Sequence, residues 1–257
     1  MMERGNVAEI GCLLARRAGV AILSHYGQET KVVTKGDGSP LTQADQEAHQ
    51  IIVDGLEREF PGIPVRSEEA DDDGTRLGAP WCFLVDPLDG TKVFLSHNGE
   101  FTVNIALIHG GRPVAGVVYA PALDDLYWAW EGGGAWRQHS GANPEAIHTS
   151  PYLVPPRLAV SRSHRSAEED RFIADHGVTE VVAMGSSLKG CLVARGDAEL
   201  YLRAGTVMEW DIAAMDAIVT EAGGRLVAWA DRTKPLVYNK PDLRVEGFIC
   251  TSSKGPL

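Results

Sequence analysis

Apolar residues recur at helical spacing in two stretches near the beginning of the chain. Over residues 3–24 they fall every three or four positions, which predicts an amphipathic helix. Residues 43–60 repeat the pattern and follow Thr42, a residue type that commonly caps helices. Residues 36–40 between them are rich in glycine and proline, so we expect a loop there.

Short apolar and β-branched runs replace this spacing in the next part of the chain. Residues 81–85 are too short a run for an independent helix and stop at Asp86, which predicts a buried strand that ends in a charged turn. Further strands, paired as two hairpins, are expected at residues 101–109, 113–119, 126–130 and 135–138.

Strands and helices alternate after a polar segment that reaches about Pro156. The predicted strands are residues 158–161, 178–183, 199–203, 224–228 and 247–251, and the predicted helices are residues 168–176, 187–196 and 211–222. Such alternation is typical of an α/β unit. We therefore expect an α/β layered sandwich in two parts, with helices and a meandering sheet in residues 1–156 and an α/β unit in residues 157–257.

Composition narrows the possible functions. The 257 residues carry a formal net charge of −11, which argues against binding to nucleic acid but does not exclude a small anionic substrate. No stretch is apolar enough to insert into a membrane, and the first residues lack the pattern of a signal peptide, so we expect a soluble, cytoplasmic protein. The four cysteines are scattered among apolar residues, which favours reduced core thiols over a zinc site.

Acidic residues stand at the ends of several predicted elements. Glu68 and Glu69 follow a short strand, Asp86 and Asp89 flank a turn, and Asp211 lies at a helix start. Each has a simpler explanation by itself: a solvated surface pair, a polar turn and a helix N-cap. If the carboxylates converge, their repulsion requires a cation. Oxygen ligands without nearby cysteine or histidine favour Mg²⁺ over Ca²⁺ or Mn²⁺.

Two glycine-containing segments offer backbone amides that suit phosphate. Gly90 and Thr91 follow the second acid of the turn, and Gly185, Ser186 and Ser187 precede a predicted helix. Unpaired amides at a helix N-terminus bind anions. Carboxylate-bound Mg²⁺ beside such amides indicates phosphoryl transfer, and without a Walker-type loop the simplest reaction is hydrolysis of a phosphate monoester.

Three ordered motifs, at residues 68–69, 86–91 and 210–211, resemble the signature of the inositol monophosphatase superfamily. These enzymes are Mg²⁺-dependent, lithium-sensitive phosphatases. The resemblance covers nearly the whole chain. It implies the layered α-β-α-β-α sandwich of the inositol monophosphatase and fructose bisphosphatase type, with the metal site between the two halves.

The resemblance also implies roles for individual residues. Two or three Mg²⁺ ions would be held by Glu68, Asp86, the Leu88 carbonyl, Asp89 and Asp211. Asp45 and Thr91, together with the metal ligand Glu68, would activate the attacking water. The amides of Gly90 and Thr91 would bind the scissile phosphate during an in-line displacement.

Within the superfamily, further motifs are similar to the 3′(2′),5′-bisphosphate nucleotidases of bacterial sulfate assimilation. They lie at residues 89–94, 98–106, 185–189 and 235–241. Inositol-preferring relatives usually carry a glutamate where this chain has Ala204, which weakens an inositol assignment. Residues 244–246 depart from the nucleotidase pattern. Substrate contacts are expected from Gly90, Thr91, Gly185, Ser186, Ser187 and Lys189, although Lys189 fits a surface lysine equally well.

These observations lead to three hypotheses. The first is a Mg²⁺-dependent nucleotidase that converts adenosine 3′,5′-bisphosphate to AMP and phosphate. The second keeps the chemistry but takes inositol, histidinol or sugar phosphates, and the third is a non-catalytic metal-binding regulatory protein. Residues 36–40 are expected to close over the site as a lid. A homodimer is compatible with the sequence, which does not determine the oligomeric state.

Overall fold

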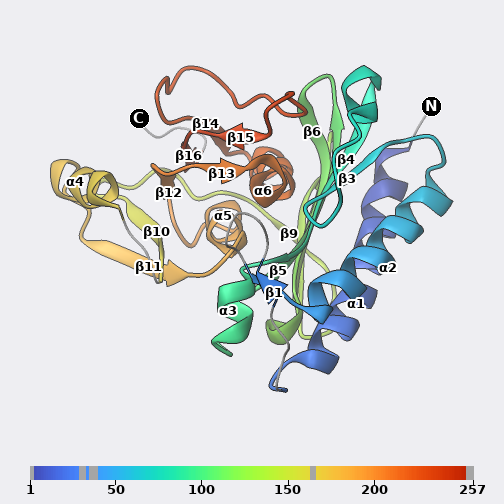
Figure 1. Ribbon diagram of the computed structural model, residues 1–257. Helices are drawn as coiled ribbons and strands as arrows, with labels where there is room; N and C mark the ends of the chain where they lie inside the picture. The colour runs from blue at the N-terminus through green and yellow to red at the C-terminus, as the bar shows by residue number, and fades with distance from the viewer. Residues whose placement is uncertain (1–2, 29–32, 35–39, 163–165, 253–257) are drawn as a thin grey trace.

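The computed structural model describes residues 3–28, 33–34, 40–162 and 166–252. Two sheets and three layers of helices alternate as an α-β-α-β-α sandwich (Figure 1), which confirms the predicted fold class. The outer pair is α1 (Arg4–His25) and α2 (Gln43–Glu59), the central pair is α5 (Leu188–Ala194) and α6 (Glu209–Glu221), and α4 (Ala167–Asp175) covers the far side. Short helices are α3 (Thr91–Leu95) and two 3₁₀ turns, Thr75–Gly78 and Pro121–Leu123.

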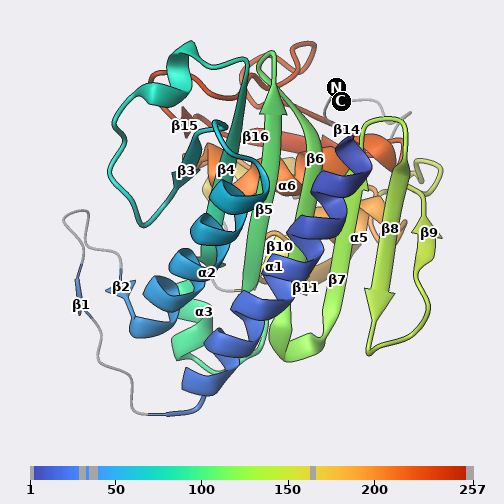
Figure 2. The same cartoon turned by 90° about the vertical axis from the view of Figure 1, so that its right-hand side faces the viewer.

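The larger sheet has seven strands in the order β3-β4-β5-β6-β7-β8-β9. Its strands are β3 (Val65–Ser67), β4 (Trp81–Asp89), β5 (Thr102–His109), β6 (Arg112–Ala120), β7 (Asp125–Trp130), β8 (Gly134–His139) and β9 (Glu145–Ile147). Only β3 and β4 pair in parallel, and the other pairs are antiparallel. Helices α1 and α2 lie across one face of this sheet (Figure 2).

The smaller sheet has five strands in the order β11-β10-β12-β16-β14. Its strands are β10 (Arg157–Ser161), β11 (Glu180–Met184), β12 (Leu200–Arg203), β14 (Arg225–Ala228) and β16 (Phe248–Thr251). Two-residue ladders join β1 (Val33–Thr34) to β2 (Pro40–Leu41) and β13 (Val207–Met208) to β15 (Arg244–Val245).

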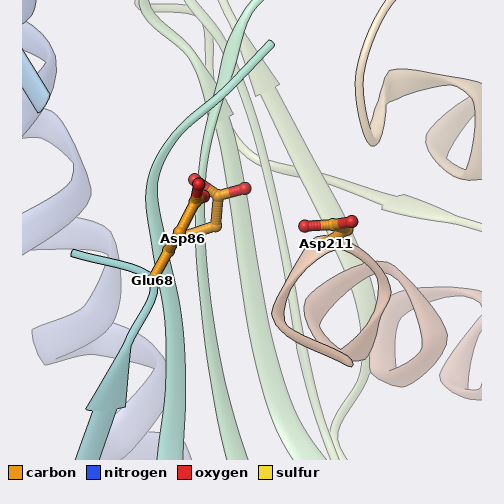
Figure 3. Close-up of side chains that lie close together, drawn as sticks. All are labelled: Glu68, Asp86 and Asp211. Carbon is orange, nitrogen blue, oxygen red and sulfur yellow. The ribbon is translucent and has the colours of Figure 1, made fainter. Parts of the chain in front are cut away.

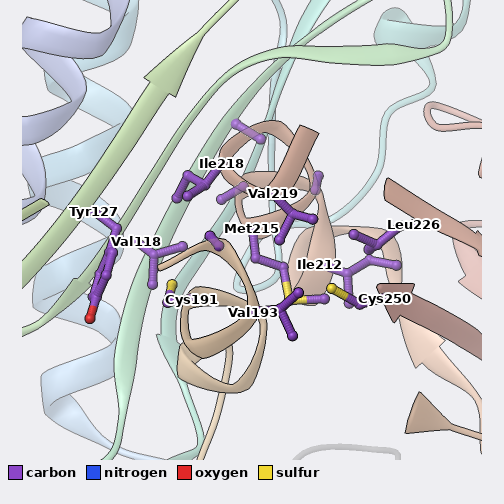
Figure 4. Close-up of a cluster of buried hydrophobic side chains, with 14 of the residues drawn as sticks. Val118, Tyr127, Cys191, Val193, Ile212, Met215, Ile218, Val219, Leu226 and Cys250 are labelled. Atoms are coloured by element: carbon purple, nitrogen blue, oxygen red, sulfur yellow. The ribbon is translucent and has the colours of Figure 1, made fainter. Parts of the chain in front are cut away.

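Strand β4 shows how the period-two pattern sets the direction of the site. Phe83 and Val85 pack toward α1 and α2, whereas Cys82 and Leu84 belong to the core around α5 and α6. Asp86 lies on the same face of the strand as Cys82 and Leu84, so it faces the central helices. Figure 4 shows the apolar core that these helices fill between the two sheets.

Most predicted elements are present within a few residues of their expected bounds. The prediction that the apolar strand stops at Asp86 is wrong, because β4 continues to Asp89. Strand β9 lies in the polar segment and was not predicted. The proposed lid over residues 36–40 lies outside the described residues except for Pro40, which begins β2. The division near Pro156 stays a prediction, since α5 and α6 pack in one core with strands of the larger sheet.

None of the helices among the described residues combines the length and apolar character needed to cross a bilayer.

Candidate metal and phosphate site

Three of the predicted carboxylates meet at one point between the larger sheet and α6. Glu68, Asp86 and Asp211 each offer an oxygen, and these oxygens all lie within 4.8 Å of one another. Glu68 and Asp86 project from the strand side, and Asp211 approaches from the helix opposite (Figure 3). Tertiary structure thus brings together acids from distant parts of the chain, as the sequence predicted.

The parallel pairing of β3 and β4 brings Glu68 beside Asp86. Ser67 pairs with Val85, and the Glu68 amide donates a hydrogen bond of 3.0 Å to the Val85 carbonyl. Glu68 therefore leaves the sheet directly next to Asp86, which is 2% exposed.

Helix α6 delivers Asp211 from its first turn. The helix begins at Glu209, so the expectation that Asp211 begins or caps it is wrong. Met208 is the N-cap, and its amide donates to Oδ2 of Asp211 at 2.9 Å. The carboxylate thus accepts an amide that has no partner within the helix, while it also faces the other acids.

An irregularity in β4 separates Asp86 from Asp89. Asp86 pairs with Asn104 and Asp89 pairs with Thr102, so two residues of β4 oppose one of β5. This bulge changes the direction of the strand before it ends at Asp89. The turn that the sequence predicted at this point is thus a bulge within a strand.

Asp89 is held by a set of donors around one of its two oxygens. Oδ2 accepts hydrogen bonds from the Ser187 amide at 2.8 Å, the Ser187 hydroxyl at 3.2 Å, Thr102 at 3.3 Å and Asn104 at 3.4 Å. All the hydrogen bonds to this carboxylate among the described residues end on Oδ2. Oδ1 is therefore the Asp89 atom that is available to a cation.

The electrostatics of the cluster fit a divalent cation. Burial raises the pKa of Asp86 well above its usual value, and the charges of Glu68, Asp89 and Asp211 raise it further. Burial followed by the charge of Asp89 raises the pKa of Asp211 well above its usual value. A cation would offset both effects, and carboxylate oxygens are the ligands that Mg²⁺ prefers.

Asp45 and Thr91 form a second polar pair beside the cluster. The Thr91 hydroxyl lies 3.3 Å from Oδ1 of Asp45 and 3.4 Å from the Leu88 carbonyl, so both oxygens are acceptors for it. Oδ2 of Asp45 accepts the amide and hydroxyl of Thr42, at 2.8 and 2.5 Å, in a capping box. The start of α2 thus fixes Asp45 against the start of α3.

The two glycine-containing segments that were predicted to bind phosphate, residues 90–91 and 185–187, differ in whether their amides are available. Gly90 has φ +88°, and a Cβ there would lie 2.4 Å from Oγ of Ser186, so only glycine fits at the start of α3. The expectation that Ser187 offers its amide to phosphate is wrong, because Asp89 accepts it. Ser186 donates its hydroxyl to the Asp89 carbonyl at 2.9 Å, and Gly185 packs against Glu100. The segment 185–187 therefore braces Asp89.

Lys189 is buried, so the alternative of a surface lysine is wrong. The side chain is in the first turn of α5 with 7% of its surface exposed. Its Nζ donates to the Ser186 carbonyl at 2.6 Å and lies 5.1 Å from the centroid of the Tyr201 ring. Burial lowers the pKa of Lys189 to about 8, against an opposing effect of Asp89.

A pocket of about 210 Å³ joins the acids to Lys189, and Asp89, Gly90, Ser186 and Asp211 are among its lining residues. Arg203 and Glu169 also line it, although sequence reasoning singled out neither. Arg203 could have been recognised from the sequence, because it is a charged residue at the end of an apolar strand, as Asp89 is. Glu169 had no such signal, since acids are common in the first turn of a helix.

Comparison with known proteins identifies the family of the chain. A family model described as the inositol monophosphatase family matches residues 3–255. The 3′(2′),5′-bisphosphate nucleotidase CysQ of Escherichia coli (strain K12) is 46% identical over 231 residues, which cover 88% of this chain and 92% of that protein.

Solved structures give the same result. The structure of CysQ from Bacteroides thetaiotaomicron, a bacterial member of the inositol monophosphatase family, matches with a TM-score of 0.86 and 39% identity over 97% of this chain and 98% of that chain. A Thermotoga maritima IMPase matches with a TM-score of 0.81 and 25% identity over 96% and 92%. The resemblance inferred from the motifs is thereby confirmed, and the chain belongs to the inositol monophosphatase family of metal-dependent phosphatases.

Proposed function

We propose that this protein is a Mg²⁺-dependent 3′(2′),5′-bisphosphate nucleotidase that converts adenosine 3′,5′-bisphosphate to AMP and phosphate. The observation that carries the proposal is one pocket lined both by Asp89 and Asp211, the latter a member of the acidic cluster, and by the cations Lys189 and Arg203. The acidic side chains suit a phosphate bound through metal, and the basic side chains suit a second phosphate. The similarity to CysQ nucleotidases supports the same substrate.

The proposed metal site uses all the acids of the cluster and one carbonyl. We assign two or three Mg²⁺ ions to Glu68, Asp86, the Leu88 carbonyl, Asp89 and Asp211. When bound, Mg²⁺ activates water and neutralises charge on the phosphate and leaving oxygen. The remaining tasks fall to residues of the chain.

In the proposed mechanism the hydroxyl of Thr91 orients the attacking water. The water gives its proton toward Oγ1 of Thr91, whose own proton moves toward Oδ1 of Asp45, 3.3 Å away. Glu68 takes part in activating the same water. The amides of Gly90 and Thr91 hold oxygens of the scissile phosphate in line for attack. The P–O bond to the ribose breaks opposite the incoming oxygen, and the leaving ribose oxygen takes a proton from solvent water.

A substrate panel in saturating Mg²⁺ tests the proposal. We expect kcat/KM for adenosine 3′,5′-bisphosphate to exceed that for adenosine 3′-monophosphate by about 10- to 100-fold, because the second phosphate makes charge-assisted bonds worth about 1.5–3 kcal/mol. The two nucleotides differ only in the 5′-phosphate and are therefore matched. A higher kcat/KM for inositol 1-phosphate would contradict the proposal.

Inositol 1-phosphate is the second candidate substrate because a carboxylate does lie near Ala204. Glu169, from α4, accepts the Ala204 amide at 3.3 Å and lines the pocket. Its oxygens could accept polyol hydroxyls. We rank this candidate second, because inositol 1-phosphate lacks a second anion for Lys189 and Arg203.

A cytoplasmic location and a homodimer stay predictions. Cell fractionation and light scattering of the purified protein would test them.

A further inference from the structure

Arg66 lies between the two segments that bring Glu68 and Asp211 together. It is the middle residue of β3, two positions before Glu68. Its guanidinium carbon lies 4.6 Å from the centroid of the Trp210 ring, and Trp210 directly precedes Asp211. One side chain therefore contacts both ligand-bearing segments.

On the β3 side, Arg66 holds the turn that carries Glu68. Its Nη1 donates to the Ser67 carbonyl and, at 2.6 Å, to the Ala70 carbonyl. These two carbonyls flank Glu68 and Glu69. The guanidinium thus closes the turn on both sides of the acidic pair.

On the α6 side, Trp210 offers a fixed surface. The ring is 6% exposed and belongs to the core between the two sheets. A guanidinium stacked on a buried indole is restricted in position, and the contact is attractive because the ring face is negative. The turn of Glu68 is thereby fixed relative to the first turn of α6.

Burying the guanidinium of Arg66 costs free energy that its contacts must offset. Nε of Arg66 is buried and has no hydrogen-bond partner among the described residues. An apolar side chain would avoid this cost but could neither bind the two carbonyls nor bring a positive charge near the acids.

We propose that Arg66 is a positioning residue for the divalent-cation site. It fixes the spacing between Glu68 and Asp211 by holding the Glu68 turn against Trp210. The inference rests on the metal site of the proposed function, but it concerns affinity for the metal and is independent of the substrate.

Titration of the metal-free protein with Mg²⁺ alone, followed by calorimetry, tests the inference. Arg66→Met keeps the aliphatic stem but loses both carbonyl bonds and the charge, so we expect the Kd for Mg²⁺ to rise about tenfold. Arg66→Lys keeps a cation near the ring without the planar fork, and we expect a smaller rise, about threefold.

Arg16→Met is the matched control. Arg16 also lies over an aromatic ring, 5.3 Å from the centroid of Tyr119, and bonds Asp124 at 3.2 Å. It contacts none of the clustered acids. Its loss should lower Tm by an amount comparable to that of Arg66→Met and leave the Kd for Mg²⁺ unchanged.

A double-mutant cycle separates positioning from general destabilisation. Trp210→Leu and Arg66→Met should each raise the Kd for Mg²⁺. The Kd of the double variant should be close to that of whichever single variant has the higher Kd. Fully multiplicative effects on Kd would overturn the coupling, as would Arg66→Met binding Mg²⁺ as tightly as wild type.

If Arg66→Met fails to fold, the same double-mutant cycle can be measured with Arg66→Lys and Trp210→Phe. Unchanged Kd values in both would then overturn the inference. Wild-type protein that binds no Mg²⁺ would overturn the proposed function as well, whereas tight binding by wild type and variants alike would overturn this inference alone.

Discussion

The hydroxyl of Thr91 and Oδ1 of Asp45 lie 3.3 Å apart, at the starts of two helices that no local pattern links. Asp45 is fixed by its bonds to Thr42, and Thr91 follows Gly90, a position where only glycine fits. The pair is therefore held in place before any ligand arrives. Such preorganisation is what a water-activating pair requires.

Removal of the Thr91 hydroxyl should slow the chemical step. Thr91→Val keeps the shape of the side chain, so we expect kcat to fall by about 10²- to 10⁴-fold, the range for loss of proton transfer. Steady-state kinetics should show little change in the Mg²⁺ concentration for half-maximal rate. Ser96→Ala, just after α3, is the control, because within the described part of the chain its hydroxyl bonds only the Val93 carbonyl. Near-normal kcat in Thr91→Val would contradict the assigned role.

Asp89→Asn should abolish most turnover without weakening the metal-free fold. The substitution removes one of several mutually repelling charges, while the amide oxygen can still accept the Ser187 amide. We expect kcat to fall at least about 100-fold and Tm in chelator to match or exceed that of wild type.

Thermal melts with and without Mg²⁺ measure the second part of this prediction. At 100 times its Kd, Mg²⁺ should stabilise wild type by about 2.7 kcal/mol and the variant by less. Asp54→Asn, an exposed acid of α2, serves as control. A variant that melts well below wild type in chelator would refute the repulsion argument.

Deprotonation of Lys189 should weaken binding of the bisphosphate. Burial lowers the pKa of Lys189 to about 8, so the cation is lost as pH rises through that value. We expect KM for adenosine 3′,5′-bisphosphate to rise above pH 8 in wild type and to be high and constant from pH 7 to 9 in Lys189→Met. Adenosine 3′-monophosphate, which lacks the second phosphate, should show no such rise. The same pH profile for both substrates would remove Lys189 from the second-phosphate site.

Asp216 should make the fold less stable as pH rises. Burial raises its pKa from 3.8 to about 6, while Tyr238 at 2.7 Å and Thr220 at 3.1 Å partly oppose the shift. The folded state therefore holds this proton more tightly than the unfolded chain. The resulting stabilisation is complete below about pH 4 and is lost as pH rises through about 6.

Asp216→Asn isolates this effect because Asn cannot titrate. Between pH 4 and pH 8, the free energy of unfolding of the variant relative to wild type should rise by about 2.4 kcal/mol, because most of the effect of a shift of about two pKa units falls in this range. Urea unfolding at both pH values in chelator measures it. A difference between the two proteins that does not change with pH would show that Asp216 has the same pKa in the folded and unfolded states, which would contradict the prediction.

The sequence by itself determined the elements and the chemical type of the site. Helical and alternating periodicities depend on neighbouring residues, so α1, α2 and most strands could be located from them. The acids Glu68, Asp86, Asp89 and Asp211 were recognisable because carboxylates at element ends are costly unless something binds them.

Only the tertiary structure decided how these residues are used. The bulge after Asp86, the capture of the Ser187 amide by Asp89, the burial of Lys189 and the contact of Arg66 with Trp210 all depend on register and packing between remote segments. Local pattern contains no information about such contacts, because a side chain's partners are set by which surfaces the sheets and helices bury against each other.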